Sequence, residues 1–437
     1  MKRFVISMGL VAALFFGCSP DDKEIIYDDA LTGDVAGDST ETPDSDVADV
    51  DSERDESDVE PGEDSTDAKD DATEDPGSGD DNPSDDGSDE DIELPECPSP
   101  DELIEPAISG TVYRDNDFTS YSFYRQRLTD GDELLGDVDV VLFSESDEKT
   151  TTTCPNGVFS FGGLEDGNYI LVVDPGDGSE CASTNNTRHL AGAIRNGSLG
   201  ILTIGDSIPS QGDGDYPFFP ARLKELMDPL VPTEDINVAV PGSVSEQWLP
   251  GSNFYENKVK PNLEQAQVVL MSLGGNDYVN RFGAINPNDQ DAVAEAIGGL
   301  PEFQAQVIAN LVTTIKAIQT DAPNVDIVYV LYPNFARSVI WEQQAGDFVA
   351  LIITYFEQAL DEMVQIMGQE IEHLIIADMQ RATKDLDIDP YLCDGLHLSE
   401  LGTFFWAKEI FQALGGVIVG DEPLGTSRLI GFAPAAE

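Results

Sequence analysis

The stretch GILTIGDSI, residues 200–208, begins as an apolar segment and ends on small and polar residues. A short apolar run of this kind is typical of a strand that is buried on both faces of a parallel sheet. In such sheets the carboxyl ends of the strands carry the functional groups. We therefore expect Ser207 to begin a helix directly after this strand and to direct its hydroxyl and its N–H into a cleft.

Strands and helices alternate through the rest of the chain. Further buried strands are predicted at residues 236–240, 268–273, 326–331 and 373–377. Helices are predicted at residues 217–227, 301–320 and 343–367, and a closing helix capped by Ser399 runs to Leu414. This alternation predicts a three-layer α/β/α domain with a parallel sheet over residues 199–418.

The predicted strand ends and the last loop hold the groups that acyl transfer requires: a nucleophile, a base, a residue that orients the base, and donors for the oxyanion. Ser207 is the candidate nucleophile. Only 3 histidines exist, and His397 is the candidate base because Asp394, on the same glycine-containing loop, can fix its tautomer. Gly242 can offer an unhindered N–H and Asn276 a side-chain amide to the oxyanion.

Four short stretches resemble sequence blocks of the SGNH, or GDSL, hydrolases, in the family's order: Gly205-Asp206-Ser207-Ile208, Pro241-Gly242-Ser243, Gly274-Gly275-Asn276-Asp277 and Asp394-Gly395-Leu396-His397. The resemblance covers about residues 198–416. Ile208 stands where the family has leucine, and Leu398 stands where it often has proline. Neither change removes a reacting group.

The resemblance implies a role for each matching residue. Ser207 is the implied nucleophile, His397 the base and Asp394 its partner, while Ser207, Gly242 and Asn276 form the implied oxyanion hole. The implied enzyme is a serine esterase, a hydrolase acting on ester bonds that requires no metal and no organic cofactor.

The sequence indicates the substrate less clearly than it indicates the catalytic residues. We expect short acyl esters on a polysaccharide, which would make the protein a carbohydrate acetylesterase. Two alternatives stay open: a lysophospholipase or lipase type of esterase, and a surface binding protein that has lost catalysis. Trp248 and Tyr255 are expected at the rim of the cleft, and Asp206 and Asp277 are expected to organise the loops around it.

Short alternating strands precede the α/β domain. They are predicted at residues 108–113, 138–142, 158–161 and 168–173. Together they predict a small all-β sandwich over residues 105–182, with a linker at 183–198 and a C-terminal tail at 419–437. The strand order resembles carboxypeptidase regulatory-like, or prealbumin-like, modules over about residues 106–176. The resemblance implies a spacer, and glycan binding is the alternative.

The N-terminus has the features of an export signal over residues 1–17. Lys2 and Arg3 precede an apolar run, Phe4 to Phe16, that is too short to span a bilayer. The following Gly17-Cys18-Ser19 resembles the lipobox of bacterial lipoproteins, which implies cleavage before Cys18 and lipid attachment to its thiol. A plain secretory signal is the alternative. We expect a protein that is anchored by lipid to the outer membrane of a bacterium and exposed on the cell surface.

Charge divides the chain into two parts. It carries 85 acidic against 22 basic residues, a net charge of −63, so that a nucleic-acid partner is excluded. Residues 21–96 hold 33 of the acids and 3 of the bases. Such a segment cannot bury enough apolar surface to fold, and we expect a disordered acidic tether over residues 18–98. The rest is long enough for two domains, and a monomer is expected.

Once Cys18 is lipidated, four of the five cysteines are available for disulfides: Cys97, Cys154, Cys181 and Cys393. An exported chain occupies a compartment in which disulfides persist. Four cysteines allow three connectivities, and a Cys154–Cys181 pair is favoured only because it stays within the predicted sandwich. The chain has no Cys-x-x-Cys pair, and no structural zinc site of that type is expected.

Overall fold

The computed structural model describes residues 107–114, 128–129, 131–145, 147–174, 188–210, 216–283, 295, 298–345, 349–371, 373–420 and 428–432. The predicted signal, Cys18 and the predicted tether lie outside these residues, as do Cys97 and Cys181. None of the helices in the described part of the chain is long and apolar enough to cross a membrane.

A five-stranded, all-parallel sheet forms the centre of the C-terminal region. Its strand order is β11-β10-β9-β7-β8. The strands are β7 (Leu199–Gly205), β8 (Thr233–Asn237), β9 (Val268–Ser272), β10 (Asp326–Leu331) and β11 (Leu374–Asp378). Every residue of β7, β9 and β10 is buried, which explains why these strands appear in the sequence as continuous apolar runs.

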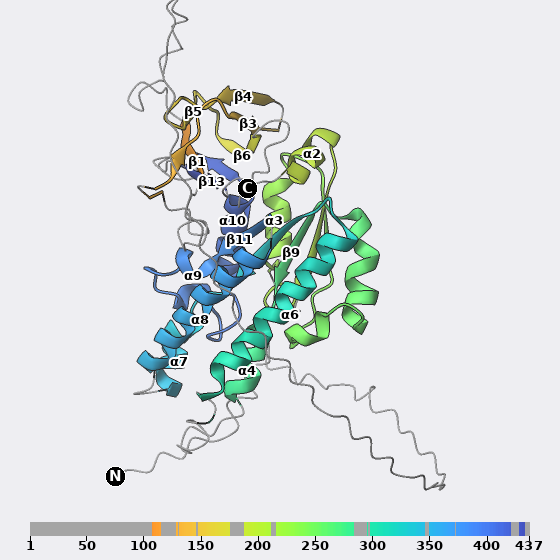
Figure 1. The fold of residues 1–437 in the computed structure, drawn as a ribbon, viewed down its shortest axis with the longest axis vertical. Coiled ribbons are helices and arrows are strands. Elements are labelled where there is room, and N and C mark those ends of the chain that lie inside the picture. The colour runs from red at the N-terminus through yellow and green to blue at the C-terminus, as the bar shows by residue number, and fades with distance from the viewer. Residues whose placement is uncertain are drawn as a thin grey trace, which may run out of the picture. The chain divides into compact units, whose positions relative to one another are not determined.

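Helices cover both faces of this sheet, and the predicted three-layer α/β/α fold is confirmed (Figure 1). Helix α3 (Phe219–Met227) connects β7 to β8, and this crossover runs toward the β8 edge of the sheet. Helix α6 (Leu300–Asp321) lies between β9 and β10 and α8 (Val349–Glu370) between β10 and β11, so these two crossovers run toward the opposite, β11 edge. Since parallel crossovers are right-handed, α3 lies on one face and α6 and α8 on the other. The closing helix α10 (Glu400–Ala413) packs against α3, and the Ser399 hydroxyl caps it by accepting the Gly402 N–H.

Two four-stranded sheets are formed largely by the N-terminal region. One contains β1 (Ala107–Arg114), which pairs with β2 (Glu133–Leu134), β5 (Val158–Gly162) and β13 (Arg428–Phe432). The other has the order β12-β6-β3-β4, from β12 (Gly416–Val419), β6 (Gly167–Asp174), β3 (Asp139–Phe143) and β4 (Glu148–Thr152). Apolar residues of both sheets, including Val112, Phe159, Leu142 and Leu171, share one buried cluster.

The strands β12 and β13 differ from the predicted end of the α/β domain and from the predicted C-terminal tail. Residues 428–432 form β13, so the expectation of a tail at 419–437 is wrong for this segment. Similarly, β12 pairs with β6 rather than with the parallel sheet, so the predicted domain end at residue 418 cuts through a strand of the N-terminal sheets. These short segments become strands because partner strands lie beside them, which a local pattern cannot reveal.

The predicted linker at 183–198 is also wrong in part, because residues 188–196 form helix α2. Leu190 and Ala193 of α2 are buried in the same cluster as β7 and as Ile170 and Val172 of β6. The neighbouring β6 residues Leu171 and Val173 belong to the cluster between the two N-terminal sheets. Because strand side chains alternate between faces, β6 is buried on both sides and joins the N-terminal sheets to the α/β core.

Smaller differences concern single elements. The strand expected at 236–240 is assigned at Thr233–Asn237, although Val240 N–H still donates to Gly205 O at 2.8 Å beyond it. The helix expected at 343–367 is two helices, α7 (Val339–Ala345) and α8. Trp248 and Tyr255 are 0% and 1% exposed, so the expectation that they form a cleft rim is wrong. Their rings fill the core because aromatic side chains bury large apolar areas.

Candidate active site

Ser207 lies in a turn immediately after β7, at the carboxyl end of the parallel sheet. Residues 207–209 form this turn and α3 begins only at Phe219, so the expectation that Ser207 begins a helix is wrong. Gly205 permits the sharp exit from the strand: its φ is +151°, and a Cβ there would lie 2.1 Å from the Ser272 carbonyl oxygen. The strand end therefore places Ser207 without a helix N-terminus.

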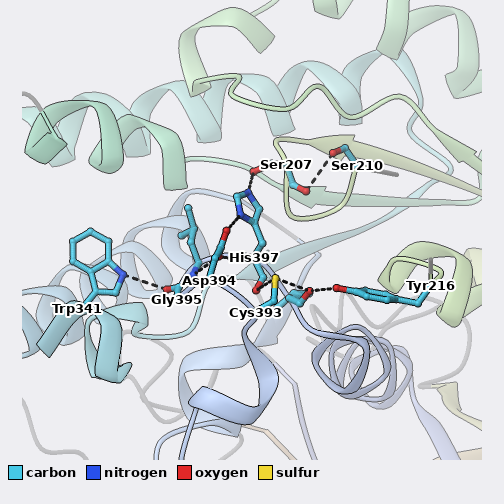
Figure 2. Close-up of polar contacts among 10 residues, drawn as sticks. Ser207, Ser210, Tyr216, Trp341, Cys393, Asp394, Gly395 and His397 are labelled. Atoms are coloured by element: carbon cyan, nitrogen blue, oxygen red, sulfur yellow. Dashed lines mark hydrogen bonds and ion pairs between the residues drawn. The ribbon is translucent and has the colours of Figure 1, made fainter. Parts of the chain in front are cut away.

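Asp394, His397 and Ser207 form one hydrogen-bonded line (Figure 2). His397 Nδ1 lies 2.6 Å from Asp394 Oδ2, and His397 Nε2 lies 3.0 Å from Ser207 Oγ. The second carboxylate oxygen, Asp394 Oδ1, accepts the N–H groups of Leu396 at 3.0 Å and His397 at 2.7 Å. Ser207 and His397 are 190 residues apart in the sequence, and only the fold brings them into contact.

Side chains from distant elements hold the loop that carries Asp394 and His397. Trp341 Nε1 of α7 donates to the Gly395 carbonyl at 3.2 Å, and the Tyr216 hydroxyl donates to the Leu398 carbonyl at 2.9 Å (Figure 2). Cys393 N–H donates to the His397 carbonyl at 2.9 Å, and Cys393 is disulfide-bonded, as is Cys154. Trp341 and Tyr216 were not identified from the sequence, because no local pattern marks a residue that acts on a loop far along the chain.

The predicted oxyanion donors are connected through Ser243. The Ser243 hydroxyl donates to the Gly205 carbonyl at 3.1 Å, two residues before Ser207. Asn276 Nδ2 donates to the Ser243 carbonyl, also at 3.1 Å, which leaves its second amide hydrogen for another acceptor. Gly242 has φ +75° and directly precedes Ser243. Within the described part of the chain, the N–H groups of Ser207 and Gly242 have no hydrogen-bond partner.

A second connection runs through Asp277, at the start of α4 (Gly275–Gly283). Asp277 accepts the Ser245 N–H at 2.8 Å and the Ser245 hydroxyl at 2.7 Å. Asn310 of α6 donates to the same hydroxyl at 3.0 Å. These bonds fix the segment that contains Gly242 against the helix that contains Asn276, so Asp277 organises these loops as expected.

The comparison with known families covers this region of the chain. Residues 203–403 match the GDSL-like Lipase/Acylhydrolase family. We call residues 203–403 the GDSL domain, after the family that they match. The GDSL domain contains all five predicted site residues, and the match supports the expectation of a hydrolase that acts on ester bonds. No curated protein matches the chain.

Solved structures similar to the GDSL domain include two esterases. An acetylxylan esterase from Geobacillus stearothermophilus is 14% identical, with 51% of this chain and 97% of that chain covered and a TM-score of 0.36. A lipase from a goat rumen metagenome is 16% identical, with 53% and 99% covered and a TM-score of 0.38. These likenesses are too weak to carry an argument about the substrate.

The pKa values of two carboxylates of the GDSL domain, Asp394 and Asp206, are shifted in opposite directions. Burial raises the pKa of Asp394, but the hydrogen bonds and the charge of His397 outweigh burial and hold that pKa below its ordinary value. Asp394 is therefore ionised at neutral pH and can stabilise an imidazolium. Burial likewise raises the pKa of Asp206, in this case to about 6, although the Tyr332 hydroxyl, the Ile208 N–H and His397 lower it.

The other histidines of the chain lie on different elements. His189 belongs to α2, and His373 directly precedes β11 with φ +58°. Among the described residues no group of three or more His, Cys, Asp or Glu side chains is arranged to hold a metal ion.

Proposed function

We propose that the GDSL domain hydrolyses carboxylic esters through Ser207, His397 and Asp394. The observation that carries this proposal is the line of two hydrogen bonds, 3.0 Å and 2.6 Å long, that joins the Ser207 hydroxyl through His397 to Asp394. A serine hydroxyl is a weak nucleophile by itself and becomes reactive when an adjacent base can take its proton.

The reaction has two steps. His397 takes the proton of Ser207 as the Ser207 oxygen attacks the ester carbonyl, and the developing oxyanion accepts hydrogen bonds from the N–H groups of Ser207 and Gly242 and the Asn276 amide. His397 then gives the proton to the leaving alcohol, and an acyl group stays on Ser207. Water, deprotonated by His397, attacks this acyl-enzyme, and His397 returns the proton to the Ser207 oxygen as the acid leaves. Asp394 holds the imidazole in the required tautomer throughout.

A serine-directed probe and ester hydrolysis together test this proposal. We expect a fluorophosphonate to label the full chain, and we expect Ser207→Ala to abolish labelling and to lower kcat for a p-nitrophenyl ester at least about 10³-fold. Asn276→Ala is expected to lower kcat by about 10² to 10³, because one oxyanion donor is lost. Ser198→Ala, at the opposite end of β7, is the control and should retain both labelling and turnover.

A folded wild-type protein that neither labels nor turns over any ester would contradict the proposal. That result would favour the alternative from the sequence, a surface binding protein without catalysis.

We also propose that the enzyme is exported and anchored by lipid at Cys18. The apolar run that ends at Gly17-Cys18 and the acidic segment after it support this proposal. Metabolic labelling with a radioactive fatty acid tests it: the wild-type chain should incorporate label and Cys18→Ser should not. Equal labelling of the two proteins would contradict the anchor.

A further inference from the structure

The cysteine next to the candidate active site is covalently bonded to a distant part of the chain. Cys393 directly precedes Asp394 and is disulfide-bonded. The GDSL domain, residues 203–403, contains no other cysteine, and the remaining cysteines all lie at residue 181 or earlier. The disulfide therefore joins the loop of the candidate base to a part of the chain that precedes the GDSL domain.

We call residues 392–398 the Asp–His loop. Its two ends lie side by side, since Leu392 and Leu398 form an antiparallel bridge. The Cys393 N–H donates to the His397 carbonyl at 2.9 Å. The Cys393 sulfur lies 3.4 Å from the same carbonyl oxygen (Figure 2). Cys393 and His397 therefore face each other across the loop, and a displacement of Cys393 displaces His397.

Two hydrogen bonds from distant elements also hold the Asp–His loop. Trp341 Nε1 donates to the Gly395 carbonyl, and the Tyr216 hydroxyl donates to the Leu398 carbonyl. Each such bond contributes only modestly, because water offers both groups another partner when the bond opens. The disulfide differs from these bonds because it restrains Cys393 until a reductant breaks it.

The sulfur of Cys393 is accessible in the folded protein. Cys393 is exposed, whereas the two leucines of the bridge beside it are buried, with Leu392 8% and Leu398 1% exposed. Exposed disulfides are the ones that soluble thiols reach and reduce. A reductant can therefore open this bond while the leucines keep the loop attached to the core.

We propose that the disulfide of Cys393 positions His397, so that the enzyme reaches full activity only in its oxidised form. The inference rests on the proposed esterase function. His397 Nε2 lies 3.0 Å from Ser207 Oγ, within reach for proton transfer. A misplacement of about 1 Å can lower the rate of such a step about 100-fold. Loosening the Asp–His loop lengthens this contact and lowers the rate.

The redox step is thiol–disulfide exchange with a dithiol. One thiolate of the dithiol attacks a sulfur of the protein disulfide, and the S–S bond breaks to give a mixed disulfide and one protein thiol. The second thiol of the reagent then closes a cyclic disulfide and releases the other protein thiol. Two electrons and two protons have passed to the protein, and a disulfide oxidant accepts them again when the bond re-forms. We therefore expect low activity in a compartment rich in dithiols.

Turnover before and after reduction tests the inference. The full chain is reduced with dithiothreitol, the reagent is removed, and kcat and KM for p-nitrophenyl acetate are measured well below the unfolding temperature. We expect reduction to lower kcat about 10-fold and to leave KM within about twofold, because the base is displaced while substrate contacts stay. Oxidised glutathione should restore kcat. A disulfide that only stabilises the fold would lower the unfolding temperature and leave kcat unchanged.

Cys393→Ser is the matched variant, because serine has nearly the shape of cysteine and cannot form the bond. It should have the kcat of the reduced wild type. Dithiothreitol should not lower its kcat further, which would show that reduction elsewhere in the chain has no effect on turnover. If Cys393→Ser does not fold, the reduced wild type provides the same test.

Three results would overturn the inference. The first is alkylation of Cys393 by iodoacetamide in the unreduced chain, and the second is a bond from Cys393 to a second copy of the chain. Mass spectrometry of peptides from the unreduced protein detects both. The third is a kcat that does not change in a protein whose Cys393 has been reduced.

Amide hydrogen exchange separates this inference from the esterase proposal. Peptides that cover the Asp–His loop should exchange faster in Cys393→Ser than in wild type, whereas peptides from the buried strand β9 should exchange equally in both. Faster exchange of the loop in a chain that hydrolyses no ester would keep the positioning role and contradict the esterase. Ester hydrolysis with equal exchange and equal kcat in the two proteins would keep the esterase and overturn the positioning role.

Discussion

Asp206 directly precedes the candidate nucleophile, and it is the most deeply buried carboxylate of the site. It is 2% exposed, accepts the Ile208 N–H at 3.0 Å through Oδ1, and accepts the Tyr332 hydroxyl through Oδ2. Burial raises its pKa to about 6 despite these bonds, so folding favours the protonated carboxyl. The residue positions the turn that carries Ser207, and the folded protein loses stability when it ionises.

The pH dependence of stability tests this description. Because the folded pKa lies above the unfolded value of about 3.9, the stabilising contribution of Asp206 is complete below pH 4 and is lost as the pH rises through about 6. Asp206→Asn stays neutral at every pH. We expect the stability of the variant relative to wild type to increase by about 2 kcal/mol between pH 4 and pH 7, measured by denaturant unfolding. A difference that does not change with pH would contradict this view of Asp206.

At the scale of elements, the two residues Leu414-Gly415 connect α10 to β12 and so join the GDSL domain to the N-terminal sheets. Gly415 has φ +88° and donates its N–H to the Gln412 carbonyl at the end of α10. Its own carbonyl accepts the Leu171 N–H of β6 at 2.8 Å. A Cβ on Gly415 would lie 2.2 Å from the Leu171 carbonyl oxygen, so both the backbone angle and the space require glycine.

Gly415→Ala should therefore destabilise the protein by about 2 to 4 kcal/mol, from a strained backbone and a clash with main-chain atoms that cannot rotate away. Thermal or denaturant unfolding measures the loss. Gly192→Ala is the matched control: Gly192 lies in α2, and a Cβ there would meet nothing within 4 Å. This control should be neutral or stabilising by about 0.5 to 1 kcal/mol. Equal stability of the two variants would refute the role given to Gly415.

At the scale of the whole described molecule, the GDSL domain is inserted into the N-terminal sheets. The chain forms β1 to β6, continues through the parallel sheet, and returns as β12 beside β6 and β13 beside β1. Val417 and Val419 of β12 are 4% and 3% exposed and complete the cluster between the two sheets. Asn168 Nδ2 of β6 also donates to the Leu226 carbonyl of α3 at 2.8 Å. The two regions therefore depend on each other.

A C-terminal truncation tests this dependence. A chain that ends at Gly415 loses both returning strands, exposes the edge of β6 and removes two buried valines, each of which contributes about 1.5 to 3 kcal/mol. We expect a lower melting temperature and a tendency to aggregate, measured by calorimetry and light scattering. A chain that ends at Phe432 keeps both strands and is the control. If the shorter chain unfolds at the same temperature as this control, the N-terminal sheets do not depend on the returning strands.

Much of the α/β fold could be predicted from the sequence, because its signals are local. The runs at 268–273 and 326–331 are apolar throughout since their strands are buried on both faces, and the structure places them as β9 and β10. Ser207, Gly242 and Asn276 could be chosen because each follows a predicted strand, and small or polar residues there have a defined place in a parallel sheet. Asp394 and His397 could be chosen because they lie three residues apart on one glycine-containing loop, and the resemblance to the SGNH family implied a role for all five residues. Their roles in catalysis stay predictions that Ser207→Ala and Asn276→Ala will test.

What the sequence by itself determined is the composition of each element and which residue types end it. Only the tertiary structure decided which partners the elements meet: β13 lies beside β1, and α2 lies in the shared core. The strand GVIV of β12 has no feature that distinguishes it from a short apolar loop until β6 offers hydrogen bonds to it. The physical reason is that pairing and burial energies arise between residues far apart in the chain, whereas sequence patterns record only local preference.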